Sequence, residues 1–186
     1  MKLIIMGPPG VGKGTQAKIL SLKLNILHLS TGEILRNEIN KDTKIGQIAK
    51  SYINFGNFVP DDIVVQIIND HIKDIDQTKG YLLDGFPRTI PQAQGFDKIL
   101  LKENQKLELV INLTANENEL VNRIIMRGRD SGRIDDTFEI IKERQKIYWE
   151  KTAPLIEYYK NKNILINIDG IGKIDEITNR ILKRIK

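Results

Sequence analysis

The segment at residues 7–15, GPPGVGKGT, decides the fold of this chain. It follows a short apolar run at residues 3–6 and precedes an amphipathic stretch typical of a helix. A glycine-rich turn from a strand into a helix leaves backbone N–H groups free to surround phosphate oxygens. Lys13 can reach the outer phosphates of a bound polyphosphate, and the helix N-terminus adds partial positive charge. The segment therefore predicts a phosphate-binding loop.

The loop departs from the usual phosphate-loop pattern at one position. That pattern places Ser or Thr directly after the lysine, whereas here Gly14 follows Lys13 and Thr15 comes one residue later. From the residues alone, direct ligation of magnesium by a hydroxyl group is therefore in question. A glycine-rich turn that binds no ligand is the alternative interpretation.

Short apolar runs alternate with amphipathic stretches along the rest of the chain. The expected strands lie at residues 3–6, 26–29, 81–83, 107–113 and 164–168. Strands separated by helices are typical of a parallel sheet covered by helices on both faces. We therefore expect an α/β fold of three layers with a five-stranded parallel sheet, in a single domain of 186 residues.

The composition excludes several other kinds of protein. There is no cysteine, so neither a disulfide framework nor a cysteine-based zinc site is possible. His28 and His71 have no spaced partner, and we expect packing or surface roles for both. The apolar start of the chain is too short for a secretory signal, and no stretch approaches the length of a membrane span. We expect a cytoplasmic protein that does not bind membranes.

The charge balance favours anionic ligands. The chain has 29 Lys and Arg against 24 Asp and Glu, a net charge of +5. Basic and acidic residues are mixed along the expected helices, and no long basic block is present. This mixture argues against nucleic acid as the partner and leaves small phosphate compounds.

An inserted segment separates the second and third expected strands. We expect two or three helices between these strands, where a simple parallel sheet needs one, and we take residues 30–59 as the inserted part. Ser30 and Glu33 have the spacing of a capping box, which predicts a helix start at Ser30.

A second group of polar residues follows the third expected strand at residues 84–88, DGFPR. Open parallel sheets place their binding sites at the carboxyl ends of their strands. Asp84 can hold magnesium, most simply through water, and Arg88 can bind a second phosphate with both arms of its guanidinium. A strand-ending turn with an exposed arginine is the alternative.

Arginines form a third group in the last third of the chain. Arg123 and Arg127 are four residues apart and so share one helix face. Arg133 ends a polar, glycine-flanked loop at residues 128–133, and Arg144 lies three helical turns farther on. A solvated charged face is the ordinary interpretation. A polyphosphate, however, would need such cations, and guanidinium groups fit the oxygens of a phosphoryl group in transfer.

Four segments together resemble the nucleoside monophosphate kinases, and among them the adenylate kinases, over essentially the whole chain. They are residues 7–16, residues 30–33, residues 84–89 with Gln92, and residues 131–136. The resemblance implies a phosphate-loop core at residues 1–29, 60–126 and 138–186, a helical AMP-binding insertion at 30–59, and a short lid at 127–137. A lid without cysteine would bind no zinc. The family also has Gly and Thr at the end of its phosphate-binding loop, as this chain has at Gly14 and Thr15.

The resemblance also implies a role for individual residues. The ATP-binding set would be Gly10, Val11, Gly12, Lys13, Gly14, Thr15, Arg123, Arg127, Gly170 and Gly172. The AMP-binding set would be Thr31, Gly32, Arg36, Asn57, Val59, Gly85, Arg88, Gln92, Arg133 and Arg144. The residues acting on the transferred phosphoryl group would be Lys13, Arg88, Arg127, Arg133 and Arg144. Asp84 would hold Mg²⁺, the one cofactor implied.

The implied reaction is a reversible, magnesium-dependent transfer of phosphate from ATP to AMP that gives two ADP, by a monomer. UMP/CMP kinases of this family typically have alanine at position 31 and asparagine at position 89, so Thr31 and Thr89 favour AMP. Gln92 agrees, since one amide offers both a donor and an acceptor to adenine. A helix-capping role for Thr31 is the structural alternative.

Other functions stay open at this point. The nearest are a UMP/CMP kinase of the same fold and a GTP-using AMP phosphotransferase. A non-catalytic nucleotide sensor or a nucleic-acid-binding module would come from a different class. Neither of these last two explains why motifs for two nucleotides occur in one chain.

Overall fold

The computed structural model describes residues 1–73, 75, 79–116, 120, 123 and 138–185. Within these residues, five strands form one sheet in the order β2-β3-β1-β4-β5, and every neighbouring pair is parallel. The strands are β1 (Lys2–Met6), β2 (Leu27–Ser30), β3 (Tyr81–Asp84), β4 (Leu109–Thr114) and β5 (Leu165–Asp169). The prediction of a five-stranded parallel sheet is therefore confirmed.

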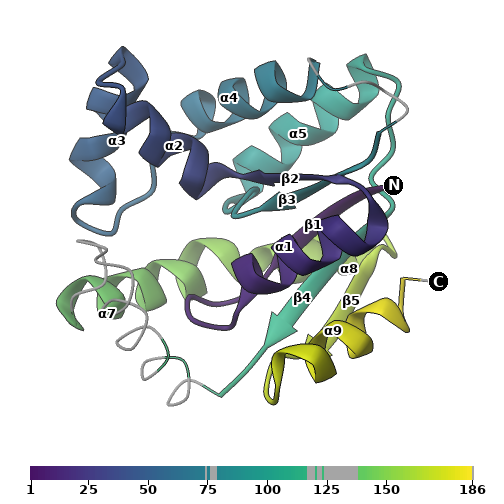
Figure 1. The fold of residues 1–186 in the computed structure, drawn as a ribbon. Coiled ribbons are helices and arrows are strands. Elements are labelled where there is room, and N and C mark those ends of the chain that lie inside the picture. The colour runs from purple at the N-terminus through teal and green to yellow at the C-terminus, as the bar shows by residue number, and fades with distance from the viewer. Residues whose placement is uncertain (74, 76–78, 117–119, 121–122, 124–137, 186) are drawn as a thin grey trace.

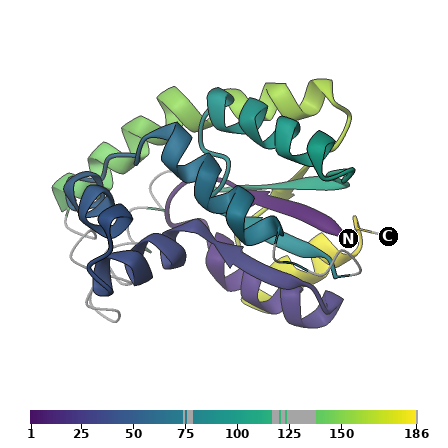
Figure 2. The same ribbon diagram turned by 90° about the horizontal axis from the view of Figure 1, so that it is seen from above.

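Helices cover both faces of this sheet, as Figures 1 and 2 show. One face carries α1 (Lys13–Leu24) and α9 (Ile174–Leu182). The opposite face carries α4 (Asp61–Lys73), α5 (Ile90–Lys102) and α8 (Pro154–Asn161). None of the helices within the described residues is both long enough and apolar enough to cross a membrane.

Three further elements lie beyond the edge of the sheet. Two helices, α2 (Thr31–Asn40) and α3 (Lys44–Ile53), follow β2 directly, and α7 (Phe138–Ile147) lies below them in Figure 1. A π-helical turn, η1 (Tyr148–Thr152), joins α7 to α8. Such turns occur mostly as short interruptions of α-helices, often at functional sites.

The sheet is buried on both faces because the side chains of its central strands alternate between two apolar cores. Leu3 and Ile5 of β1 pack into the core with α1 and α9. Ile4 and Met6 pack into the core with α4, α5 and α8. This alternation explains why β1 has a continuous apolar sequence.

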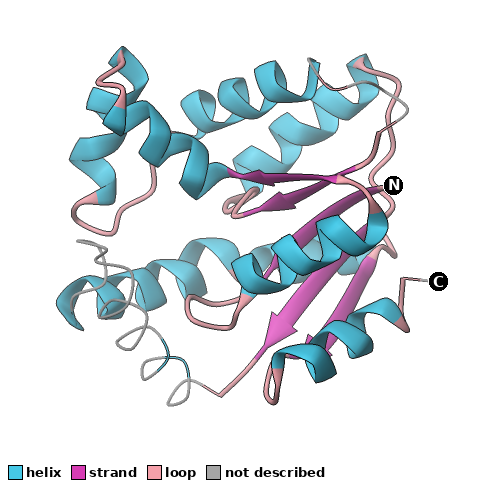
Figure 3. Cartoon of the chain, viewed as in Figure 1, coloured by secondary structure: helices cyan, strands magenta, loops and turns pink. Residues whose placement is uncertain are grey.

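The carboxyl ends of the strands lie at a common edge (Figure 3). Ile5 of β1 is opposite Asp84 of β3, and Ser30 of β2 is opposite the same residue. Met6 is opposite Asn112 of β4. The segments that follow β1, β2 and β3 therefore begin side by side, although they are far apart in the sequence.

The expected capping box at the start of α2 is only half formed. Ser30 is the N-cap, and its hydroxyl accepts a hydrogen bond from the backbone N–H of Glu33 at 3.4 Å. The Glu33 carboxylate instead forms an ion pair with Lys18 of α1 at 3.0 Å. The helix start was predicted correctly, but the partner of Glu33 comes from another helix.

A buried polar contact joins α1 to α9 beneath the phosphate-binding loop. Gln16 is almost fully buried, and its amide nitrogen donates to the carbonyl oxygen of Ile174 at 3.0 Å. Its amide oxygen accepts from the hydroxyl of Thr178 at 2.8 Å. Both ends of the Gln16 amide are thus satisfied without water.

We predict that Thr178→Val destabilises the protein by about 1–3 kcal/mol, because it leaves the buried Gln16 oxygen without a donor. Urea unfolding followed by circular dichroism measures the change. Thr178→Ser keeps the hydroxyl and is the control, with most of the stability retained. Equal stability of the valine variant and the wild type would show that this hydrogen bond contributes nothing.

Candidate functional site

The loop between β1 and α1 depends on its glycines for its backbone conformation. Gly7 and Gly12 have φ angles of 144° and 98°, where other residues are strained. A Cβ at Gly7 would lie 2.4 Å from the carbonyl oxygen of Leu113, so no side chain fits there. The Lys13 ammonium group donates to the carbonyl oxygens of Gly7 at 2.7 Å and Pro8 at 2.9 Å. The lysine therefore folds back over its own loop.

Gly170, one of the predicted ATP-side residues outside this loop, lies next to it. A Cβ at Gly170 would be 2.8 Å from a methyl group of Val11, so the segment after β5 packs directly on the loop. The guanidinium of Arg123 donates to the carbonyl oxygen of Gly170 at 3.1 Å. Gly170 itself donates to the carbonyl oxygen of Thr114 at 2.8 Å. Residues predicted from distant parts of the sequence are thus brought together.

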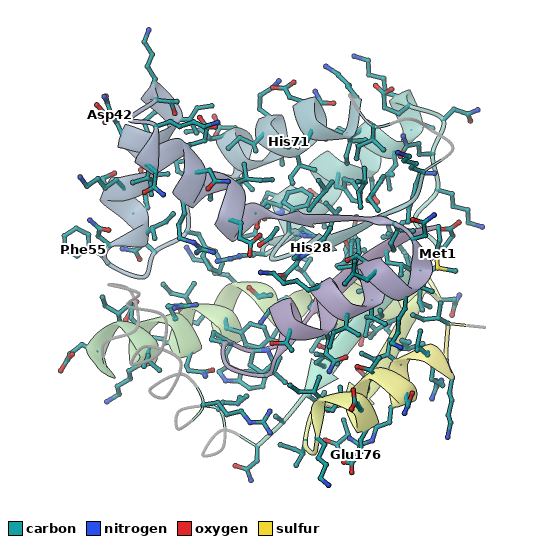
Figure 4. The ribbon with its side chains drawn as sticks, viewed as in Figure 1. Met1, His28, Asp42, Phe55, His71 and Glu176 are labelled. Atoms are coloured by element: carbon teal, nitrogen blue, oxygen red, sulfur yellow. The ribbon has the colours of Figure 1, made fainter. Side chains whose placement is uncertain are left out.

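The turn at residues 169–173, which includes Gly170 and Gly172, is fastened by α9. Arg180 donates to the carbonyl oxygens of Asp169 at 2.9 Å and Ile171 at 2.5 Å, and lies 3.7 Å from the Asp169 carboxylate. Glu176, labelled in Figure 4, accepts the backbone N–H of Lys173 at 3.1 Å. Sequence analysis missed Arg180, because a partly exposed arginine on a helix has no local pattern that distinguishes it.

Asp84 ends β3 with its carboxylate facing the start of α1. A Cβ at Gly14 would lie 3.4 Å from Asp84 Oδ2, so the glycine leaves that side of the carboxylate open. The Asp84 side chain is only 12% exposed. No group of three or more His, Cys, Asp or Glu side chains suited to a metal occurs within the described residues. One carboxylate beside a phosphate loop nevertheless fits Mg²⁺, which binds largely through water and phosphate oxygens.

The two histidines have different surroundings (Figure 4). His71 lies on α4, where its Nδ1 is 2.9 Å from the carbonyl oxygen of Ile67 in the preceding turn. His28 Nε2 lies 3.5 Å from Asp84 Oδ2. The expected ordinary role suits His71, whereas His28 contacts the proposed magnesium ligand. The sequence could not indicate this contact, since it joins neighbouring strands that are far apart along the chain.

A pocket opens between α2, the chain before α4, and the turn that follows β3. It contains nine of the ten predicted AMP-side residues, and the tenth, Arg133, lies outside the described residues. The described lining residues include three arginines but neither Asp nor Glu, so the pocket suits an anion. They are Thr31, Gly32, Leu35, Arg36, Ile53, Gly56, Asn57, Phe58, Val59, Val64, Gly85, Arg88, Gln92 and Arg144.

Arg88 is held at four points. Its backbone N–H donates to Gln92 Oε1 at 2.7 Å, and its Nε donates to the carbonyl oxygen of Gly85 at 2.8 Å. The guanidinium lies over the Phe58 ring, 5.1 Å from the ring centre. The Arg88 carbonyl oxygen accepts from the hydroxyl of Thr152 in η1 at 2.8 Å. Phe58 and Thr152 were not predicted from the sequence, and both place Arg88.

Thr31 joins the start of α2 to the end of β3. Its hydroxyl donates to the carbonyl oxygens of Gly85 at 2.8 Å and Asp84 at 3.2 Å, so its single proton is used. Thr31 is not the helix cap, because Ser30 holds that place. Gly85 has a φ of 80°, and a Cβ there would lie 2.9 Å from the Thr31 hydroxyl and 3.0 Å from the Arg88 guanidinium. Only glycine fits between them.

Helix α7 touches both sides of the site. Gln145 donates from its amide nitrogen to the carbonyl oxygen of Pro9 in the phosphate-binding loop at 3.2 Å. One residue earlier, Arg144 lines the pocket, and a Cβ at Gly56 would lie 3.2 Å from its Cγ. Helix α7 therefore places Gln145 against the loop at residues 7–12 and Arg144 against the chain that follows α3.

Comparison with known proteins agrees with this arrangement. The sequence model of the adenylate kinase family matches residues 5–164. The chain belongs to the adenylate kinase family. It is 47% identical to an adenylate kinase of Leptospira biflexa serovar Patoc over 184 residues, 99% of each chain. It is 43% identical to one of Stenotrophomonas maltophilia over 186 residues, the whole of both chains. One of Nocardioides sp. is 42% identical over 185 residues, all of this chain and 97% of the relative.

The resemblance to adenylate kinases is thus confirmed, whereas part of the predicted site cannot be placed. Arg127, Arg133 and the whole segment 127–137 lie outside the described residues. Among the predicted catalytic residues, Lys13, Arg88 and Arg144 are described, each in the loop or pocket given above.

The contacts of Arg180 generate a prediction about the turn at residues 169–173. Arg180→Ala removes charge-assisted hydrogen bonds to two backbone carbonyls, so this turn should open more often. We expect amide hydrogen exchange at Gly170 and Ile171 to quicken by about tenfold in the absence of nucleotide. Arg184→Ala, at an exposed position of the same chain end, is the matched control. Unaltered exchange rates in the Arg180 variant would show that the turn is stable without the hydrogen bonds from Arg180.

Proposed function

We propose that this chain transfers the terminal phosphoryl group of magnesium-bound ATP to AMP, reversibly, and forms two ADP. One observation carries this proposal. The pocket lined by Arg36, Arg88 and Arg144 also contains Thr31, Gln92 and Gly85, and Asp84, the residue before Gly85, faces Gly14 of the phosphate-binding loop. A nucleoside monophosphate matches this combination, because its phosphate needs cations and its base needs hydrogen bonds.

On the acceptor side, the phosphate of AMP would lie against the three arginines, with two or three charge-assisted hydrogen bonds from each planar guanidinium. The base would face Thr31 and Gln92, with Gly32, Asn57, Val59 and Gly85 around it. The Thr31 hydroxyl proton is already donated to backbone carbonyls, so this hydroxyl offers lone pairs to a donor. The 6-amino group of adenine is such a donor.

On the donor side, the triphosphate of ATP would follow the loop of Gly10, Val11, Gly12, Lys13, Gly14 and Thr15. The adenine would lie near Arg123, Gly170 and Gly172, since Arg123 is already hydrogen-bonded to this turn. Asp84 is the residue to hold Mg²⁺, through water. The ion would supply neutralisation of charge on the phosphate oxygens when bound.

The proposed reaction requires no general base. A phosphate oxygen of AMP attacks the γ-phosphorus of ATP, and the bond from that phosphorus to the β,γ-bridging oxygen breaks. The attacking oxygen is already an anion near neutral pH, so catalysis consists of in-line positioning and stabilisation of charge. Lys13, Arg88 and Arg144 supply positive charge at the site. We add Arg127 and Arg133 to this set because the sequence resemblance implies the same role for them.

Water is a competing acceptor, so the cations should assemble fully only when both nucleotides are bound. For that reason we assign residues 30–59 to an AMP-binding segment and residues 127–137 to a short lid, around the core of residues 1–29, 60–126 and 138–186. We include a monomeric state in the proposal because the sequence resemblance implies one. A cytoplasmic location fits substrates drawn from the free nucleotide pool.

The test is an acceptor panel. Purified protein is incubated with MgATP and, separately, AMP, CMP, UMP, dTMP, GMP or no acceptor, and each diphosphate product is quantified. We expect rapid ADP formation with AMP and little product from the other reactions. MgGTP in place of MgATP, with AMP, tests the donor.

Two variants serve as controls for this panel. Lys13→Met should lower turnover with AMP by at least about 100-fold at unchanged circular dichroism. Lys23→Met, on the exposed end of the same helix, should keep the wild-type rate. Turnover with CMP or UMP instead of AMP would replace this proposal with a pyrimidine nucleotide kinase. If ATP is hydrolysed at the same rate with and without an acceptor, the second nucleotide has no place in the proposed reaction.

A further inference from the structure

We infer that Asp61, in the first turn of α4, determines which purine the acceptor pocket takes, by holding the side-chain amide of Gln92 in one orientation. The inference rests on the proposed function, because it concerns the base of the acceptor nucleotide. Asp61 is a positioning residue here: it lines an outer groove with Thr89 and Ile90, whereas Gln92 lines the acceptor pocket.

The Gln92 amide is held from two sides. Its Oε1 accepts the backbone N–H of Arg88 at 2.7 Å, and its Nε2 donates to Asp61 Oδ1, also at 2.7 Å. Thr89 donates its hydroxyl proton to the same carboxylate oxygen at 3.0 Å and caps α5 by accepting the backbone N–H of Gln92 at 3.2 Å. Gln92 is 1% exposed, so water does not replace these partners.

These partners permit one orientation of the amide. A glutamine amide can turn over and exchange its oxygen and nitrogen with almost no change in shape. A carboxylate only accepts hydrogen bonds, and a backbone N–H only donates them. Turning Gln92 over would place its oxygen against the Asp61 carboxylate and its NH₂ group against the Arg88 N–H. Both hydrogen bonds would be lost and replaced by repulsive contacts.

The fixed orientation has a consequence for the acceptor base. Each polar atom of the amide has one bonding position left, a lone pair on Oε1 and an N–H on Nε2. Adenine presents a 6-amino donor beside its N1 acceptor, which matches this order. Hypoxanthine presents a 6-oxo acceptor beside an N1–H donor, which is the reverse. An amide free to turn over would accommodate both bases, so Asp61, together with the Arg88 N–H, makes Gln92 a discriminating contact.

Thr89 fits the same scheme. Sequence comparison within the family favoured AMP partly on Thr89, yet this residue is not among the described residues that line the acceptor pocket. Its hydroxyl instead donates to Asp61. Thr89 can therefore influence the acceptor base through Asp61 or through its own hydrogen bond to the Gln92 backbone.

The experiment compares AMP with IMP, which has hypoxanthine as its base and is otherwise the same nucleotide. The measured quantity is the ratio of kcat/KM for AMP to kcat/KM for IMP at saturating MgATP. If IMP turnover is too slow, the ratio of KM for AMP to the inhibition constant of IMP replaces it. Asp61→Asn should lower the preference for AMP by about tenfold, with kcat for AMP and KM for ATP nearly unchanged. Asp62→Asn, a neighbouring exposed carboxylate, is the matched control and should keep the preference.

A double-mutant cycle tests whether Asp61 acts through Gln92. In a Gln92→Met background the amide is gone, so Asp61→Asn should cause no further loss of AMP preference. Thermal unfolding shows whether Asp61→Asn is folded. If it is not, Asp61→Ala replaces it, with the same expected result. A change that weakens AMP and IMP equally in the single variant would indicate a structural role and overturn the inference.

The two proposals can fail separately. If the wild type does not phosphorylate AMP, the proposed function fails. If the wild type phosphorylates AMP and Asp61→Asn leaves its preference over IMP unchanged, only the inference about Asp61 fails.

Discussion

The proposed chemistry depends on β1 and β3 lying side by side and parallel, with Ile5 opposite Asp84. In the order β2-β3-β1-β4-β5, the connection after β1 runs toward β2, whereas the connection after β3 runs toward β4. Ligands are expected at the carboxyl ends of β1 and β3, where these connections diverge. There the loop after β1 presents Lys13 and the start of α1, and the turn after β3 presents Asp84 and Arg88. A donor phosphate and an acceptor phosphate can meet only because these two turns share an edge.

Hydrogen-bond partners within the acceptor pocket restrict the ligand further than charge does. The described lining of this pocket includes three arginines and no Asp or Glu, which favours an anion, but any phosphate would suit this charge. The base is restricted by what Thr31 and Gln92 have left to offer. Thr31 has given its proton to backbone carbonyls, and Gln92 has one donor and one acceptor position remaining. The specificity proposed for this pocket therefore depends on the hydrogen bonds that Thr31 and Gln92 already make within the protein.

The sheet and the phosphate-binding loop could be predicted from the sequence because both depend on local patterns. Apolar runs bounded by Gly, Pro and polar residues placed every strand within two residues of its observed start. The contacts of His28, Asp61, Thr152 and Arg180 could not be predicted, because each joins segments that only the folded chain brings together. Glu33 shows the same limit. Its spacing from Ser30 predicted a capping box, yet its carboxylate forms an ion pair with Lys18 of another helix. The assignment of each site residue to ATP or AMP stays a prediction.

The most direct test of two nucleotide sites facing each other across this edge is a crystal structure with diadenosine pentaphosphate, which joins two adenosines through five phosphates. The account predicts one adenine between Thr31 and Gln92 and the other against Arg123 and the turn at Gly170. The phosphate chain would run past Lys13 toward Arg88. An analogue bound with neither adenine in the pocket of Thr31 and Gln92, or with its phosphates away from Lys13, would contradict the account.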